Sequence, residues 1–217
     1  MRKWAMVVVL AAVAALTGCA VPAASAPSFS PTSDGPVVAF YGDSYTLGTG
    51  ASDYEHRWST IIAKQRGWVE VNPSVNGLVF INNRYDKDLP AEIIAAEPDI
   101  VFVTMGLNDN FSFDVASAEI KSQITADLSR LTAALPEARF IVVEPFWYTD
   151  ERPSSVETII GWVQDAAAVI GADYIPGASH WIEGHPEWMA SDGLHPNDDG
   201  YAEMATRMDA ELVALGL

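Results

Sequence analysis

The sequence predicts an α/β fold, a three-layer α/β/α sandwich around a central, mostly parallel sheet. The first observation behind this prediction is that short apolar runs alternate with longer amphipathic segments from residue 36 onward. Strands and helices that alternate along a chain build a parallel sheet with helices on both faces. The second observation is composition, because 217 residues with 49% apolar and 10% aromatic side chains can bury one sizeable core.

The expected strands are short apolar runs bounded by glycine, proline or polar residues. The run "DIVFVTMG", at 99–106, has the composition of a buried strand. The pattern supports no particular order of the strands in the sheet. Strands are expected at residues 37–41, 68–72, 99–106, 139–145 and 172–176.

The clearest of the expected helices carry apolar residues at spacings of three and four. The last of them, "NDDGYAEMATRMDAELVAL", offers Asn197 as N-cap and has Asp198 and Asp199 in its first turn, where the helix dipole favours anions. In segment 115–138 the periodic apolar residues are Ile120, Ile124, Leu128, Leu131 and Leu135. Helices are expected at residues 56–67, 89–98, 115–138, 155–171 and 197–215.

Residues 1–18 have the pattern of an export signal. Arg2 and Lys3 precede an apolar run at 4–16, and the small residues of "LTGC", at 16–19, close it. Thirteen apolar residues are too few to cross a hydrocarbon core, which needs about 20, so a permanent transmembrane helix is the weaker interpretation. "LTGC" resembles the lipobox of bacterial lipoproteins, which implies that Cys19 becomes the first residue and is acylated.

The remainder divides into a tether and one domain. Residues 19–35 are rich in Ala, Pro and Ser without hydrophobic period, which is typical of a linker. A single folded domain is expected at 36–217. The protein is therefore expected outside the cytoplasm, either anchored by lipid on the outer face of the membrane or secreted. Cys19 is the chain's single cysteine, so no internal disulfide can form.

Net charge excludes one class of partner. The chain has 29 acidic and 12 basic residues, a formal charge of −17. Nucleic acid binding needs a basic surface that replaces condensed counterions. We therefore expect no nucleic-acid partner.

Polar residues follow several of the expected strands. Ligands of open parallel sheets gather beyond the carboxyl ends of the strands. Ser44 follows the first strand, Gly77 lies after the second, and Asn108 follows the third. Asp192 and His195 lie in "SDGLHPN", just before the last helix. Taken singly, each of these is an ordinary turn or capping residue.

Four blocks in order carry a resemblance to a known family. The blocks "GDSYTLG", "VNG", "GLND" and "DGLHPN" resemble those of the SGNH hydrolase superfamily, also called GDSL esterases, and span residues 42–201. The resemblance implies an SGNH/flavodoxin-like α/β/α fold and hydrolysis of O-acyl esters through an acyl-serine intermediate. It implies no cofactor and no metal. The substrate class it implies is a small-molecule or glycan acyl ester.

The resemblance assigns roles to matching positions. Ser44 would be the nucleophile, His195 the general base, and Asp192 the group that orients the imidazole and stabilises its cation. The oxyanion would be bound by the backbone N–H groups of Ser44 and Gly77 and the side-chain amide of Asn108. Gly77 matches the corresponding block of the family only through its Asn-Gly pair. Gly48 and Gly50 could occupy the same space beside the oxyanion.

Several alternatives stay open at this stage. The same triad would serve an acyltransferase that acts on an envelope glycan, and a surface-binding lipoprotein without activity is a further possibility. An α/β-hydrolase is disfavoured because no serine lies in G-x-S-x-G. A metal site in "HWIEGH" (His180, Glu183, His185) is a weak alternative, since its spacing is not H-E-x-x-H. The chain has little room for an inserted lid, which favours small acyl groups such as acetyl.

Overall fold

Five parallel strands form the central sheet of the protein, whose structure is a computed structural model that describes residues 35–81 and 88–217. The strand order is β2-β1-β3-β4-β5. Val38 of β1 pairs with Ile100 of β3, and Ile100 in turn pairs with Arg139 of β4. The strands are β1 (Val37–Gly42), β2 (Val69–Val71), β3 (Ile100–Thr104), β4 (Arg139–Val143) and β5 (Asp173–Ile175).

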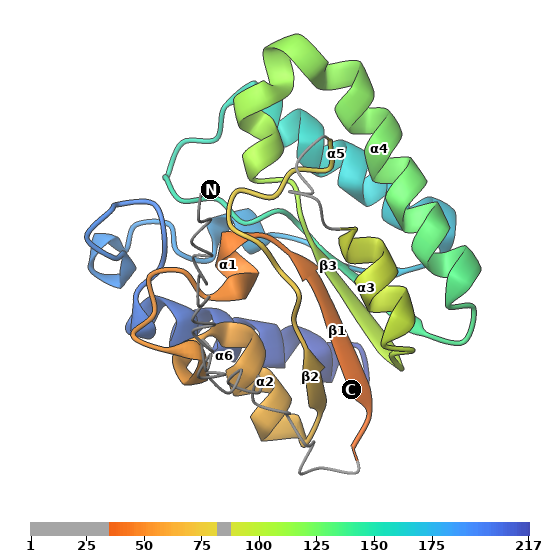
Figure 1. The fold of residues 1–217 in the computed structure, drawn as a ribbon. Helices are drawn as coiled ribbons and strands as arrows, with labels where there is room; N and C mark the ends of the chain where they lie inside the picture. Colours follow the sequence, from red (N-terminus) through yellow and green to blue (C-terminus); the bar gives the residue numbers. More distant parts are fainter. Residues whose placement is uncertain (1–34, 82–87) are drawn as a thin grey trace, which may run out of the picture. The chain divides into compact units, whose positions relative to one another are not determined.

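Helices cover both faces of this sheet (Figure 1). On one face lie α2 (Trp58–Arg66) and α6 (Asp198–Ala214), which contact each other. On the other face lie α3 (Leu89–Ala95), α4 (Phe113–Ala134) and α5 (Ser154–Ile170). The three-layer α/β/α sandwich predicted from the sequence is therefore confirmed.

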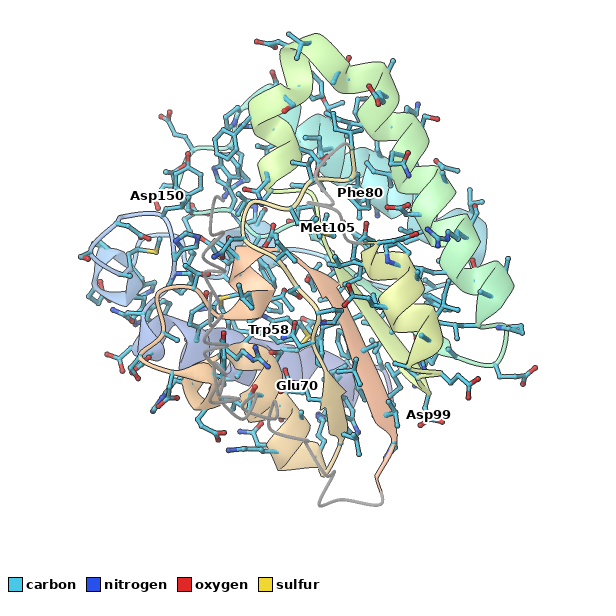
Figure 2. The ribbon with its side chains drawn as sticks, in the orientation of Figure 1. Trp58, Glu70, Phe80, Asp99, Met105 and Asp150 are labelled. Carbon is cyan, nitrogen blue, oxygen red and sulfur yellow. The ribbon has the colours of Figure 1, made fainter. Side chains whose placement is uncertain are left out.

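Alternation along the strands builds two separate cores. Val38 and Phe40 of β1 belong to the core beneath α2 and α6, whereas Ala39 and Tyr41 belong to the core beneath α3, α4 and α5. Successive side chains of a strand point to opposite faces, so a strand covered on both sides must be apolar throughout. In Figure 2 Trp58 marks the first core, and Phe80 and Met105 the second.

The helices follow the expected pattern with small shifts at their ends. Ile120, Ile124, Leu128 and Leu131 are all buried along α4. Asn197 caps α6, because its side chain accepts a hydrogen bond from the Gly200 N–H at 3.0 Å.

The sequence did not predict the short helices. These are α1 (Ser44–Leu47) and the 3₁₀ helices η1 (Tyr54–His56), η2 (Asn108–Ser112), η3 (Ala178–His180) and η4 (Pro186–Trp188). Single turns are too short to show a period. The strand expected at 139–145 ends at Val143, because Pro145 has no N–H to donate to the sheet.

The predictions of export and lipid anchoring concern the N-terminal residues 1–35. The export signal 1–18, Cys19 and all of the tether except Gly35 lie outside the described residues. Among residues 35–81 and 88–217, no helix has the length and apolar character needed to span a bilayer.

Candidate active site

The polar residues singled out in the sequence meet at the carboxyl edge of the sheet. One pocket of about 300 Å³ is lined by Ser44, Asn76, Gly77, Asn108 and His195. They reach it from four segments, since Ser44 begins α1 after β1, Asn76 and Gly77 follow β2, Asn108 begins η2 after β3, and His195 precedes α6. Asp192 completes the set from the loop that carries His195.

Ser44 is held by a tight strand-to-helix turn. Asp43 caps α1 by accepting a hydrogen bond from the Tyr45 N–H at 3.0 Å, and Gly48, at φ +89°, ends the turn with its N–H on the Ser44 carbonyl oxygen. The strand end is equally crowded, because a Cβ at Gly42 would lie 2.5 Å from side-chain atoms of Thr46 and Thr104. Ser44 is only 5% exposed. The nucleophile candidate thus sits on a rigid support.

Asp192 and His195 form a hydrogen-bonded pair. Asp192 Oδ2 lies 2.7 Å from His195 Nδ1, while Oδ1 accepts the backbone N–H groups of Leu194 at 2.9 Å and His195 at 3.0 Å. These bonds, above all the one to the imidazole, lower the pKa of Asp192 to about 2. An anionic Asp192 fixes the proton of a neutral imidazole on Nδ1, so Nε2 is the ring nitrogen left to act as a base.

The loop that carries this pair is fixed at both ends. Met189 and Pro196 form an antiparallel bridge, and the Ala190 N–H donates to the His195 carbonyl oxygen at 2.8 Å. Tyr45, next to the candidate nucleophile, donates its hydroxyl to the Leu194 carbonyl oxygen at 2.7 Å. This bond ties the histidine loop directly to α1.

Glycines at the site have distinct environments. Gly77 lies at φ +66°, in the left-handed region that favours glycine, and lines the pocket. A Cβ at Gly48 would meet the Arg57 side chain, and a Cβ at Gly50 would lie 2.4 Å from the Pro196 carbonyl oxygen and 3.0 Å from the His195 Cβ. Of the three glycines weighed from the sequence, Gly77 is the one that lines the pocket.

The Asn108 amide is anchored from two sides. Its Nδ2 donates to Asp43 Oδ2 at 3.2 Å and to the Leu78 carbonyl oxygen at 3.1 Å. Both amide hydrogens therefore have acceptors, and an oxyanion would share or replace one of them. The anchoring orients the amide before a substrate arrives, which is the property that an oxyanion donor needs.

Two buried carboxyl groups lie behind the site. Burial raises the pKa of Asp43 to about 7 and that of Asp109 to about 8. Asp109 Oδ1 accepts the Phe80 N–H at 2.9 Å, while its Oδ2 is buried without a partner among the described residues. Both residues accept hydrogen bonds from backbone N–H groups, and the sequence pattern predicted neither their burial nor their raised pKa.

The residues of the alternative metal site lie in two separate pairs. The "HWIEGH" residues do not converge, because His180 pairs with Glu183 while His185 pairs with Glu187, and the described residues contain no cluster of three metal-ligating groups.

The fold and site together define a class of protein. A serine on a strand-to-helix turn, a histidine–aspartate pair and an anchored amide at the edge of a parallel sheet are the parts of a serine hydrolase built on an α/β/α sandwich. The GDSL-like Lipase/Acylhydrolase family matches residues 40–203. The chain belongs to this family, as its sequence blocks predicted, and is an ester-hydrolysing serine hydrolase.

Individual relatives agree with this assignment. The chain is 29% identical over 194 residues to the GDSL lipase Rv0518 of Mycobacterium tuberculosis, a match covering 83% of this chain and 82% of that protein. Its fold is similar to the psychrotrophic esterase EstA of Pseudoalteromonas sp., with a TM-score of 0.66 at 18% identity, covering 83% and 98% of the two chains. The acetylxylan esterase Axe2 of Geobacillus stearothermophilus gives 0.58 at 18% identity, covering 82% and 94%.

Proposed function

We propose that the protein is an exported, lipid-anchored serine esterase that hydrolyses O-acyl esters through an acyl-serine intermediate. Acetyl and other short acyl groups are among its substrates, and the alcohol is a small molecule or a glycan. The pattern of residues 1–19 supports export and the anchor. The fold similarity to an acetylxylan esterase supports a carbohydrate ester as one candidate substrate.

The proposed mechanism gives each of these groups one role. Ser44 Oγ attacks the carbonyl carbon while His195 Nε2 accepts its proton, and Asp192 stabilises the resulting imidazolium. The negative oxygen of the tetrahedral intermediate is bound by the Ser44 and Gly77 N–H groups and the Asn108 amide. His195 then protonates the leaving alcohol, and a water molecule repeats the sequence on the acyl-serine to release the acid.

One observation carries this proposal above the others. His195, bonded to Asp192 at 2.7 Å, lines the same pocket as Ser44 and Asn108, although these residues come from distant parts of the chain. Each residue has an ordinary structural role on its own. Ser44, Asn108 and His195 around one 300 Å³ space, with Asp192 bonded to the histidine, form an arrangement that has a direct use in acyl transfer.

The test is hydrolysis of p-nitrophenyl esters from acetate to decanoate by the purified protein. Ser44→Ala and His195→Ala should each lower kcat at least about a thousandfold. Ser122→Ala and His180→Ala, which change the same residue types outside the pocket, should stay within about twofold of the parent. Activity retained in Ser44→Ala would contradict the proposed mechanism.

Acyl transfer to a sugar hydroxyl remains the alternative chemistry of the same site. A sugar acceptor added to the assay would divert the acyl group from water to the acceptor if the protein is a transferase. The proposed esterase should instead release free acid at an unchanged rate. A folded protein that hydrolyses no ester in the series would favour a binding lipoprotein.

A further inference from the structure

A second pocket adjoins the catalytic one on the side of the oxyanion donors. It has a volume of about 620 Å³ and shares Gly77 and Asn108 with the catalytic pocket. Its apolar lining comes from Val79 and Ile81 after β2, from Phe111 of η2, and from Val115 and Ala116 at the start of α4. We call this pocket the apolar groove.

Exposed apolar side chains concentrate at this groove. Phe111 is 61% and Val115 is 90% exposed, and they are two of the five large hydrophobic side chains exposed among the described residues. Single exposed hydrophobic residues are ordinary. Two that line one hollow next to an active site instead offer a surface that a bound apolar group would cover.

The chemistry of ester cleavage defines what can reach this groove. The tetrahedral carbon carries the Ser44 oxygen, the oxyanion, the leaving oxygen and the first carbon of the acyl chain. The leaving oxygen must face His195, which protonates it, and the oxyanion must face Gly77 and Asn108. Neither Ser44 nor His195 lines the groove. A substituent of the tetrahedral carbon that extends past the oxyanion donors, on the side away from His195, is therefore the acyl chain.

The charge of the groove also favours a neutral chain. Glu119 lies at its lining, and the protein as a whole carries −17. An anionic group would be repelled there, whereas a hydrocarbon chain would cover the apolar side chains and leave the carboxylate in water. A third pocket, beside Tyr148 and His185, shares no lining residue with the catalytic pocket and offers no such continuity.

We propose that the apolar groove binds the acyl chain of the substrate, so that the enzyme accepts medium-chain acyl esters such as octanoate as well as short ones. This inference rests on the proposed function and specifies its acyl class. Each methylene that the groove buries should raise kcat/KM by up to about fourfold until the groove is filled. The rate should therefore increase from acetate through butyrate to octanoate.

The test compares chain-length profiles of groove variants with the parent. Ala116→Trp fills the groove and Phe111→Ser makes its rim polar, and each should lower the octanoate-to-acetate ratio of kcat/KM at least about tenfold. Val169→Trp adds the same ring at an exposed valine of α5 outside every pocket described above and should leave the ratio unchanged. Ester concentrations stay below micelle formation, so that the profile reports binding to the protein.

The outcomes separate the two proposals. Hydrolysis of acetate with an identical chain-length profile in the parent and both groove variants would overturn the groove and leave the esterase proposal intact. No hydrolysis of any ester by the folded parent would overturn both. A change of alcohol at constant acyl group provides a last check, because a defect that follows the alcohol would make the groove a leaving-group site and contradict the inference.

Discussion

Asn108, the proposed oxyanion donor, joins three segments of the fold through one side chain. Its amide donates to Asp43 and to the Leu78 carbonyl oxygen, so the segments after β1, β2 and β3 meet at one side chain. A side chain that is already oriented does not need to be ordered in the transition state. This explains why an asparagine amide can serve where a flexible donor would be weaker.

Replacing Asn108 with alanine tests that role. Asn108→Ala should lower kcat on p-nitrophenyl acetate about 100- to 1000-fold with little change in KM, because an oxyanion donor acts on the transition state rather than on the bound ester. Asn110→Ala, two residues along η2, should remain within about twofold of the parent. An increase in KM alone would instead make Asn108 a substrate contact.

Asp109 gives a residue-scale prediction about stability. Burial raises its pKa from 3.8 to about 8, so the folded protein holds this proton more tightly than the unfolded chain. Between those two values the folded state binds more protons, and the free energy of unfolding must fall as pH rises. Ionised Asp109 at pH 8 therefore destabilises the fold.

The isosteric variant Asp109→Asn removes this ionisation and retains an acceptor for the Phe80 N–H. Between pH 5 and pH 8 its melting temperature should fall by at least about 3 °C less than that of the parent. Asp114→Asn, at an exposed acid of α4, controls for the loss of one negative charge and should behave like the parent. If the melting temperatures of all three proteins depended equally on pH, ionisation of Asp109 would cost the folded state little free energy, which would contradict this prediction.

At the scale of elements, the loop before α6 carries the histidine–aspartate pair. Asn197 caps α6 through Oδ1, and its Nδ2 donates to the Glu187 carbonyl oxygen at 2.8 Å and the Met189 carbonyl oxygen at 3.2 Å. One side chain therefore fixes the start of the helix and the strand-like bridge that closes the loop. The position of His195 depends on both.

Asn197→Ala should lower stability and turnover together. Loss of an N-cap costs about 1 kcal/mol, which for a domain of this size corresponds to a melting temperature lower by about 2–4 °C. A looser histidine loop should also reduce kcat several-fold. Asn197→Ser retains the cap and should recover most of the stability, whereas only part of kcat should return because serine cannot replace both Nδ2 bonds. Unchanged stability in Asn197→Ala would contradict the capping role.

At the scale of the whole molecule, the proposed location depends on Cys19. Cys19→Ala should move the protein from the membrane to the soluble fraction or leave it unprocessed, because acylation of this cysteine would supply the anchor. Cell fractionation with detergent partitioning measures the effect. Ser25→Ala, in the tether, is the matched control. Unchanged partitioning of Cys19→Ala would contradict the lipid anchor.

The sequence by itself determined the fold class, because the alternation of apolar runs and amphipathic segments depends on local periodicity. It also placed Asp192 and His195 together, since three positions along one loop suffice for their contact. Four blocks in order identified the family. The anchor, export and catalytic roles stay predictions of the sequence.

Only the tertiary structure decided the features that depend on distant contacts. Strand order, the burial of Asp43 and Asp109, and the apolar groove each require segments far apart in the chain to meet. Periodicity reports which side of an element faces a core, but not which other element supplies that core. The neighbours of a side chain set its pKa and its exposure, and those neighbours are fixed only when the sheet is assembled.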